Sequence, residues 1–272
     1  MLRVSKTLID YRELILALAW KNIVVRYKQA YLGLAWAVLR PVMLMLIFTL
    51  VRAFIGIDSG GIPYPILTFA ALMPWMLFQD ATTDGVSSIV QNANLIRKIY
   101  FPREVFPLTA VVTKLIEFAI TVVILAGLML YYKMAPTIWI LWAPLIIVYV
   151  VLVALSICFA GAALNVYFRD VSAAIPVALS LLMYASPVIY PLSLVKRKLL
   201  EEQIAGDWSG MLYIAYTANP LAGIIDSFQR VVLKGLSPDL PSMLPGIILT
   251  LVALPISYLF FKNAEAYFAD VI

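Results

Sequence analysis

Long apolar runs dominate the chain. Six of them reach or approach the ~20 residues with which an α-helix crosses a bilayer. They cover residues 34–54, 66–89, 106–130, 137–166, 171–190 and 244–261. The fourth run is longer than a crossing needs, so its helix is expected to tilt or protrude. With no internal repeat and no Ser/Gly linker, we predict a single all-α membrane domain over residues 1–272, with six transmembrane helices.

The segment 8–31, before the first run, has helical spacing but is too polar to cross. One face is apolar and aromatic: Leu16, Trp20, Ile23, Tyr27 and Tyr31. Lys21 and Lys28 lie on another face. Because Trp and Tyr favour the head-group region, we predict an amphipathic interface helix at the membrane surface. The alternative is a charged lead-in to the first span.

The segment 92–102, between the second and third runs, predicts a short helix outside the bilayer. Leu95, Ile99 and Phe101 give it an apolar side, and Pro102 is expected to end it. Such a helix suits insertion into a groove on a soluble partner. A helix that rests on lipid head groups is the alternative.

The connection 191–236, before the last run, is longer than an ordinary loop and predicts structure of its own. The sequence SPVIYP at 186–191 breaks a helix at the end of the fifth run, where freed backbone groups need protein or water partners. Asn219 and Pro220 then begin a helix, and Gly235 is placed to end it. That helix is too short and too charged to cross, so it either dips into the membrane and returns or lies flat.

Composition agrees with a membrane protein. Hydrophobic residues make up 64% of the chain and charged residues 13%, about half the share usual in a soluble domain. The net charge of +5 comes from basic residues between the apolar runs, which fits the positive-inside rule better than nucleic-acid binding. This bias predicts that both termini are cytoplasmic, although the basic cluster at 196–198 opposes it.

Few residues could carry chemistry. Histidine is absent and the single cysteine, Cys158, lies in an apolar run, which argues against disulfides, thiolate metal sites and histidine catalysis. No glycine-rich phosphate loop is present, so the chain is not itself an ATPase and no cofactor or metal is predicted in it. Lys114 and Glu117, one turn apart, predict an ion pair within the third run, with substrate contact as the alternative. Asp80 and Asp84 are expected to end the second run in water.

Several stretches together resemble one family. They are WKNIVVRYKQ at 20–29, followed by Leu32, Gly33 and Trp36, NANLIRKIYFPREVFP at 92–107, NVYFRDV at 165–171, SPVIYP at 186–191 and NPL at 219–221. In this order they are similar to the permease subunits of ABC exporters for lipid-linked polysaccharides, of the O-antigen (Wzm), capsule and teichoic-acid type. The C-terminal stretch 260–272 looks most like the O-antigen branch.

The resemblance implies a function that composition does not show. It implies a homodimer in the cytoplasmic (inner) membrane, bound to two ATP-hydrolysing subunits that hold ATP and Mg²⁺, with a coupling helix at 92–102 and re-entrant gate helices within 191–236. The substrate would be an undecaprenyl-pyrophosphate-linked glycan, most closely O-antigen. A permease for teichoic acid, capsule or a small amphiphile, or an ATP-independent transporter, is the alternative.

Candidate site residues follow from these roles. A glycan path favours aromatic surfaces, for which the candidates are Tyr31, Trp36, Trp75, Phe78, Tyr184 and Tyr190, with packing or interface anchoring as the alternative for each. The pyrophosphate would be attracted by Arg26, Lys28 and Arg40. Coupling to the ATPase would fall to Asn94, Leu95, Ile96, Arg97, Lys98, Ile99, Tyr100, Phe101 and Pro102.

Overall fold

The computed structural model describes residues 9–28, 35–56, 61–98 and 101–268, and in these ranges every regular element is helical. The elements are α2 (Arg12–Lys28), α3 (Ala35–Ile55), α4 (Tyr64–Gln91), α5 (Ala93–Lys98), α6 (Val105–Tyr131), η1 (Ile138–Trp142), α7 (Ala143–Tyr167), α8 (Asp170–Tyr184), α9 (Leu192–Lys196), η2 (Arg197–Glu201), η3 (Gly206–Trp208), α10 (Ser209–Ala218), α11 (Pro220–Gln229), η4 (Arg230–Lys234) and α12 (Leu240–Glu265). The predicted all-helical fold class is confirmed for this part of the chain.

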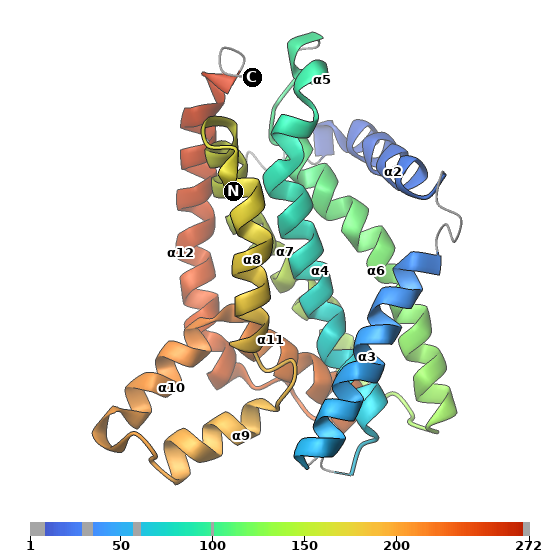
Figure 1. Ribbon diagram of the computed structural model, residues 1–272, viewed down its shortest axis with the longest axis vertical. Helices are drawn as coiled ribbons and strands as arrows, with labels where there is room; N and C mark the ends of the chain where they lie inside the picture. The colour runs from blue at the N-terminus through green and yellow to red at the C-terminus, as the bar shows by residue number, and fades with distance from the viewer. Residues whose placement is uncertain (1–8, 29–34, 57–60, 99–100, 269–272) are drawn as a thin grey trace.

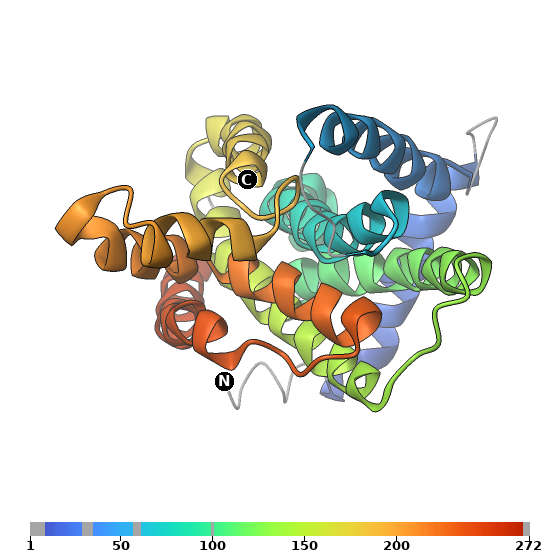
Figure 2. The same ribbon diagram turned by 90° about the horizontal axis from the view of Figure 1, so that it is seen from below.

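The long helices α3, α4, α6, α7, α8 and α12 run along the long axis of the molecule (Figure 1). Helices α2 and α5 lie at one end, together with the C-terminal end of α12; we call this the α5 end. Helices α9, α10 and α11 lie at the opposite end, the α11 end, and cross the ends of the long helices (Figure 2). Both sets of short helices come from the segments that the sequence predicts to be non-spanning.

Three described helices are long and apolar enough to cross a membrane: Val105–Tyr131, Ile138–Tyr167 and Leu240–Glu265. Helix α8 is apolar but shorter. The protein is therefore a multi-pass membrane protein. The other predicted runs form α3 and α4, and the second half of α4 is rich in polar side chains.

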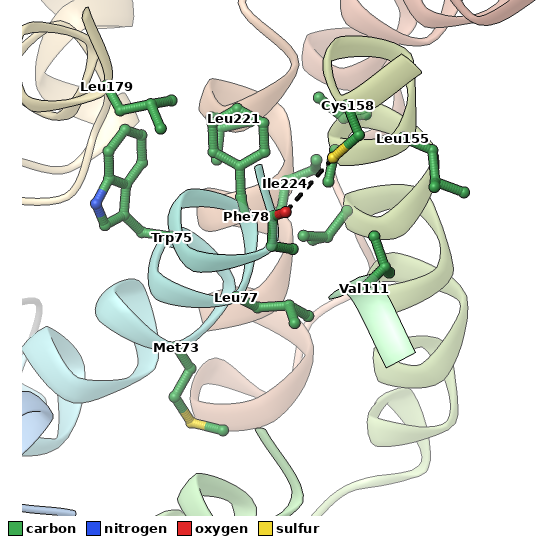
Figure 3. Close-up of a cluster of buried hydrophobic side chains, with 14 of the residues drawn as sticks. Met73, Trp75, Leu77, Phe78, Val111, Leu155, Cys158, Leu179, Leu221 and Ile224 are labelled. Atoms are coloured by element: carbon green, nitrogen blue, oxygen red, sulfur yellow. Dashed lines mark hydrogen bonds between the residues drawn. The ribbon is translucent and has the colours of Figure 1, made fainter. Parts of the chain in front are cut away.

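Helix α4 is the centre of the bundle, with contacts to α3, α6, α7, α8 and α11. It approaches α7 closely because small residues lie between them: a Cβ added to Gly85 would be 2.3 Å from the Cys158 Sγ, and one added to Gly161 would be 2.5 Å from Val86. The Cys158 thiol donates a hydrogen bond to the Ala81 carbonyl (Figure 3). Cys158 is buried, as expected of a packing residue.

Helix α2 packs against the bundle along one face. The residues buried against α6 and the bundle are Ile15, Ala19 and Ile23, at four-residue spacing. Of the predicted apolar and aromatic face only Ile23 is buried, while Leu16 and Trp20 are exposed and do not pack against the bundle. The exposed Trp20 lies on a face of α2 that is not covered by the described part of the chain.

Two helices end earlier than the sequence predicts. Helix α8 ends at Tyr184, not at 190, because the SPVIYP segment is already irregular at Ser186. Phe101 and Pro102 are not helical, so the helix after α4 ends before Pro102 instead of at it. Elsewhere the local signals hold: the Asn219 side chain accepts a hydrogen bond from the Leu221 N–H, and Gly235 ends the following helix with a φ of 62°.

Candidate functional site

A cavity of about 490 Å³ opens between α2, α3, α4 and α6. Three cationic and three anionic side chains line it, together with the rings of Tyr27, Trp36 and Phe118. The charged residues are Arg26, Arg40, Lys114, Asp80, Asp84 and Glu117. Because each cation is matched by a carboxylate, an anion that enters must compete with carboxylates already in place.

Four of these groups form a closed ring of alternating charge, which we call the charge ring. The Arg26 guanidinium lies 2.6 Å from Asp84 and 3.4 Å from Glu117. The Lys114 ammonium lies 2.8 Å from Glu117 and 3.3 Å from Asp84. The ring therefore joins the short helix α2 to α4 and α6.

The predicted ion pair between Lys114 and Glu117 is confirmed, and it belongs to this larger network. Lys114 is the most deeply buried member, with its side chain 5% exposed. Such a buried cation depends on its partners, because a charge taken out of water is costly unless it is paired and hydrogen-bonded.

Arg40 of α3 makes a separate pair with Asp80 of α4, at 2.9 Å. Asp80 and Asp84 thus do more than end an apolar run in water, because both carboxylates are held by cations from other helices. Trp36 lies on the first turn of α3 and lines the same cavity. The structure thereby brings together Arg26 and Arg40, which the sequence nominated for the pyrophosphate, and Trp36, which it nominated for the glycan path.

The electrostatics of α2 reflect this environment. Burial lowers the pKa of the Arg26 guanidinium, but the charges of Asp84 and Glu117 outweigh it, so the pKa is raised above its ordinary value. Burial, reinforced by Glu117, raises the pKa of Tyr27 to about 12. Both groups therefore keep their protonated form well above neutral pH.

Other nominated aromatic residues lie elsewhere. Trp75 and Phe78 are packed in the core, where Trp75 points towards Leu179 of α8 and Phe78 towards Leu221 of α11 (Figure 3). In this structure neither ring can contact a substrate.

Tyr184 is exposed at the end of α8, and the Tyr190 hydroxyl donates to the Tyr184 carbonyl at 3.1 Å. Lys28 is exposed and does not line the cavity. Tyr31 lies outside the described residues.

The segment nominated for ATPase coupling is partly exposed at the α5 end. Asn94, Arg97 and Lys98 are exposed, Leu95 is half-buried and Ile96 is buried. Ile99 and Tyr100 lie outside the described residues.

Phe101 is buried, with its ring centroid 5.3 Å from that of Phe106. It therefore packs inside the bundle instead of extending the exposed apolar side that the sequence predicted. Pro102, which follows it, is half-buried.

Sequence reasoning missed Arg52, near the end of α3. Its side chain is buried, and it donates to the carbonyls of Val188 at 2.9 Å and Ile189 at 2.5 Å. The sequence offered two signals: an arginine at the end of an apolar helix, and the SPVIYP segment, whose free carbonyls need a donor. Nothing in the sequence joins two sites that lie 136 residues apart.

The family model for ABC-2 type transporters matches residues 13–201 of the chain. The chain belongs to this family. The match begins in α2, contains all six charged residues of the cavity and ends with η2, so the charge ring lies within the family domain. Helices α10 to α12 follow it.

Curated relatives of this ABC-2 type transporter match almost end to end. An "O-antigen export system permease protein RfbA" of Myxococcus xanthus is 27% identical over 273 residues, which is 100% of each chain. Two proteins of the same name from Klebsiella pneumoniae are 29% and 28% identical over 265 residues, covering 96% of this chain and 95% of theirs. The similarity therefore includes the helices at the α11 end.

Proposed function

We propose that this chain is the transmembrane subunit of an ATP-driven exporter that moves a lipid-linked polysaccharide, most closely an undecaprenyl-pyrophosphate-linked O-antigen, across the cytoplasmic membrane. The observation that carries the proposal is the end-to-end similarity to O-antigen export permeases from two genera. The family match supports a transport subunit whose ATP is hydrolysed by a partner.

The proposed topology has six spans, formed by α3, α4, α6, α7, α8 and α12, with the α5 end in the cytoplasm. Support comes from the basic residues at that end and from the positive-inside rule. Helix α2 would lie in the cytoplasmic interface with Trp20 among the lipid head groups. Helices α10 and α11 would be re-entrant from the opposite side, as gate helices.

Coupling to ATP would run through α5. We propose a homodimer bound to two ATP-binding subunits, with the exposed side chains of Asn94, Arg97 and Lys98 and the half-buried Leu95 in a groove of the ATPase. Closure of the ATPase subunits on ATP would then move the spans attached to α5 as rigid bodies.

The pyrophosphate would enter the cavity beneath α2. Arg26 and Arg40 line that cavity, and Lys28 would draw the anion from the head-group layer. Since Arg26 and Arg40 are paired with carboxylates, the phosphate oxygens would replace Asp84 and Asp80 as their partners. Binding would thus loosen the attachment of α2 and α3 to α4.

The glycan itself would follow aromatic rings, which offer flat surfaces without dense hydrogen bonding. Trp36 lines the cavity, and Tyr184 and Tyr190 lie near the opposite end of the bundle. Tyr31 completes the proposed path, although it lies outside the described residues.

A deletion strain tests the function directly. Cells without this gene are expected to accumulate undecaprenyl-linked glycan inside and to lose surface polysaccharide, and the wild-type gene should restore export. Loss of a drug or other small amphiphile from the efflux profile, with normal surface glycan, would sink the proposal. The same would follow if the purified chain moved substrate in liposomes with no ATPase present.

A matched set of variants tests the arginine role separately from stability. Arg40→Gln removes the cation but leaves Asp80 unpaired, whereas Arg40→Gln with Asp80→Asn removes both charges. If Arg40 binds the pyrophosphate, both should lose export at unchanged protein level, while Arg40→Lys keeps most of it. Recovery of export in the double variant would show that only the ion pair matters.

A further inference from the structure

The chain just after α5 is fastened to the C-terminal end of α12. The Glu104 carboxylate, which is 3% exposed, accepts from the Lys262 ammonium at 2.7 Å and from the Tyr258 hydroxyl at 3.3 Å. Both donors lie on α12. A charge-assisted hydrogen bond to so deeply buried a carboxylate is stronger than an ion pair between two exposed side chains.

A second contact joins the same two segments. The Arg103 backbone N–H donates to the Glu265 carboxylate at 2.9 Å, and Glu265 in turn contacts the Lys262 ammonium. Lys262 therefore bridges Glu104 and Glu265. Backbone and side chain together fix the segment 103–104 to about the last two turns of α12.

Near its C-terminal end, helix α12 packs against α7. The Phe159 ring of α7 lies 5.3 Å from Tyr258 and 5.4 Å from Phe261, centroid to centroid. The helix is continuous over its 26 residues, about 39 Å at 1.5 Å per residue. It therefore reaches from the α5 end to the α11 end of the bundle (Figure 1).

At the α11 end, α12 holds α10 and α11. The Tyr213 hydroxyl of α10 lies 2.9 Å from the Ser242 hydroxyl. A Cβ added to Gly246 of α12 would lie 2.7 Å from the Pro220 Cα, so the backbones of α12 and α11 touch without a side chain between them. Such close packing makes these helices move together.

Helices α10 and α11 in turn meet the broken end of α8. The Asn219 amide donates to the Ser186 hydroxyl at 2.8 Å, and the Tyr216 hydroxyl donates to that of Tyr190 at 3.3 Å. These are neutral hydrogen bonds, weaker than the charged contacts at the other end. A displacement of α12 would therefore separate this junction more easily than the charged contacts at the α5 end.

We propose that Glu104 and Lys262 are positioning residues that carry movement of the coupling segment through α12 to α10 and α11, and so open the junction at Ser186. The inference rests on the proposed function, in which the ATP-binding subunits move α5 and the movement spreads from there. In this proposal the movement enters at the contact between Glu104 and Lys262, passes along the continuous helix α12, and opens the contact between Ser186 and Asn219.

A cysteine at the junction reports the opening. Ser186 is fully buried, so a Ser186→Cys chain, assembled with its ATP-binding subunit in membranes, should react slowly with a membrane-impermeant maleimide. A non-hydrolysable ATP analogue should speed the reaction. The buried Cys158 of the unmodified chain should stay unlabelled and sets the background.

The Glu104–Lys262 contact is then removed in this background by Glu104→Gln, by Lys262→Met and by both. Each single variant should bind its ATPase and hydrolyse ATP, but the analogue-driven gain in labelling should fall roughly 2- to 30-fold. The double variant should lose no more of the labelling gain than the more impaired of the two single variants, because all three remove one shared contact. Lys198→Met with Glu202→Gln removes an exposed pair at the α11 end and should leave the gain unchanged.

Three results would overturn the proposal: an unchanged gain in the single variants, losses that multiply in the double variant, or no analogue effect in the parent chain. Glu265→Gln guards against misfolding, since its amide oxygen can still accept from Arg103, and it should show a smaller loss. The labelling needs no substrate. An analogue-driven gain without glycan export would therefore reject the proposed substrate and leave this linkage standing.

Discussion

The buried guanidinium of Arg52 holds the backbone carbonyl of Val188 at 2.9 Å. Val188 belongs to the SPVIYP segment, where two prolines stop the helix and free its carbonyls. In a membrane protein such carbonyls have to be satisfied from within the protein. The cation at the end of α3 thus fixes the shape of the break after α8.

Replacing Arg52 should destabilise the protein. Arg52→Met removes the donors to Val188 and Ile189, each worth roughly 1.5–3 kcal/mol as a hydrogen bond from a charged group. Arg52→Lys keeps one donor and should recover part of the loss. Unfolding temperatures in detergent measure this, and a Met variant as stable as the wild type would contradict it.

The two cations of the charge ring, Lys114 and Arg26, should contribute unequally to the stability of the protein. Lys114→Met removes a cation that is 5% exposed and leaves the half-exposed Arg26 as the remaining cation of the ring for its two carboxylates, which should cost roughly 3–5 kcal/mol. Arg26→Gln removes a side chain that is 41% exposed and should cost roughly 0.2–1 kcal/mol. Chemical denaturation of the two variants in one lipid–detergent mixture gives the order, and a reversed order would refute the burial argument.

The close approach of α4 and α7 should make Gly85 sensitive to a single methyl group. Gly85→Ala places a Cβ 2.3 Å from the Cys158 Sγ, and such overpacking costs roughly 1–3 kcal/mol. Adding Cys158→Ala should restore most of the stability, as measured by thermal unfolding. Gly127→Ala on α6, with no atom within 4 Å of the new Cβ, is the control and should unfold like the wild type.

Tyr27 should lose its proton at a higher pH than an ordinary tyrosine. Its pKa is raised to about 12 from an ordinary value of 10, through burial and then Glu117. The folded protein therefore holds this proton where the unfolded chain releases it. The resulting stability is complete below pH 10 and is lost as the pH rises towards 12.

Ultraviolet titration of tyrosinate, compared between wild type and Tyr27→Phe, isolates this group. Glu117→Gln should lower the pKa of Tyr27 by removing the nearby negative charge. A Tyr27 that ionises near pH 10 in the wild type would mean that α2 does not pack on α6 as described.

Local signals in the sequence predicted much of the fold. Apolar run lengths predicted the helical stretches 106–130 and 137–166 to within about a turn of α6 and of η1 with α7, and SPVIYP predicted the break after α8. Asn219 and Gly235 gave the start and end of the helix between them. These predictions succeed because capping, proline geometry and apolar length act within a few residues of the chain.

The partners of the charged residues were beyond such reasoning. Arg26 meets Asp84 across 58 residues and Lys262 meets Glu104 across 158, distances at which no spacing rule operates. Trp75 and Phe78 were nominated for a substrate path and are packed in the core. Leu16 and Ile23 were assigned to one face of α2, yet Ile23 is buried and Leu16 is exposed.

The sequence by itself determined that this is a helical membrane protein with two sets of non-spanning helices, because hydrophobic length and helix breakers are properties of single segments. Only the tertiary structure decided which apolar faces meet protein and which remain for lipid. Lipid and protein interior are equally apolar, so the hydrophobic pattern cannot separate them. The charge ring and the contact between Glu104 and Lys262 likewise exist only once the helices are packed.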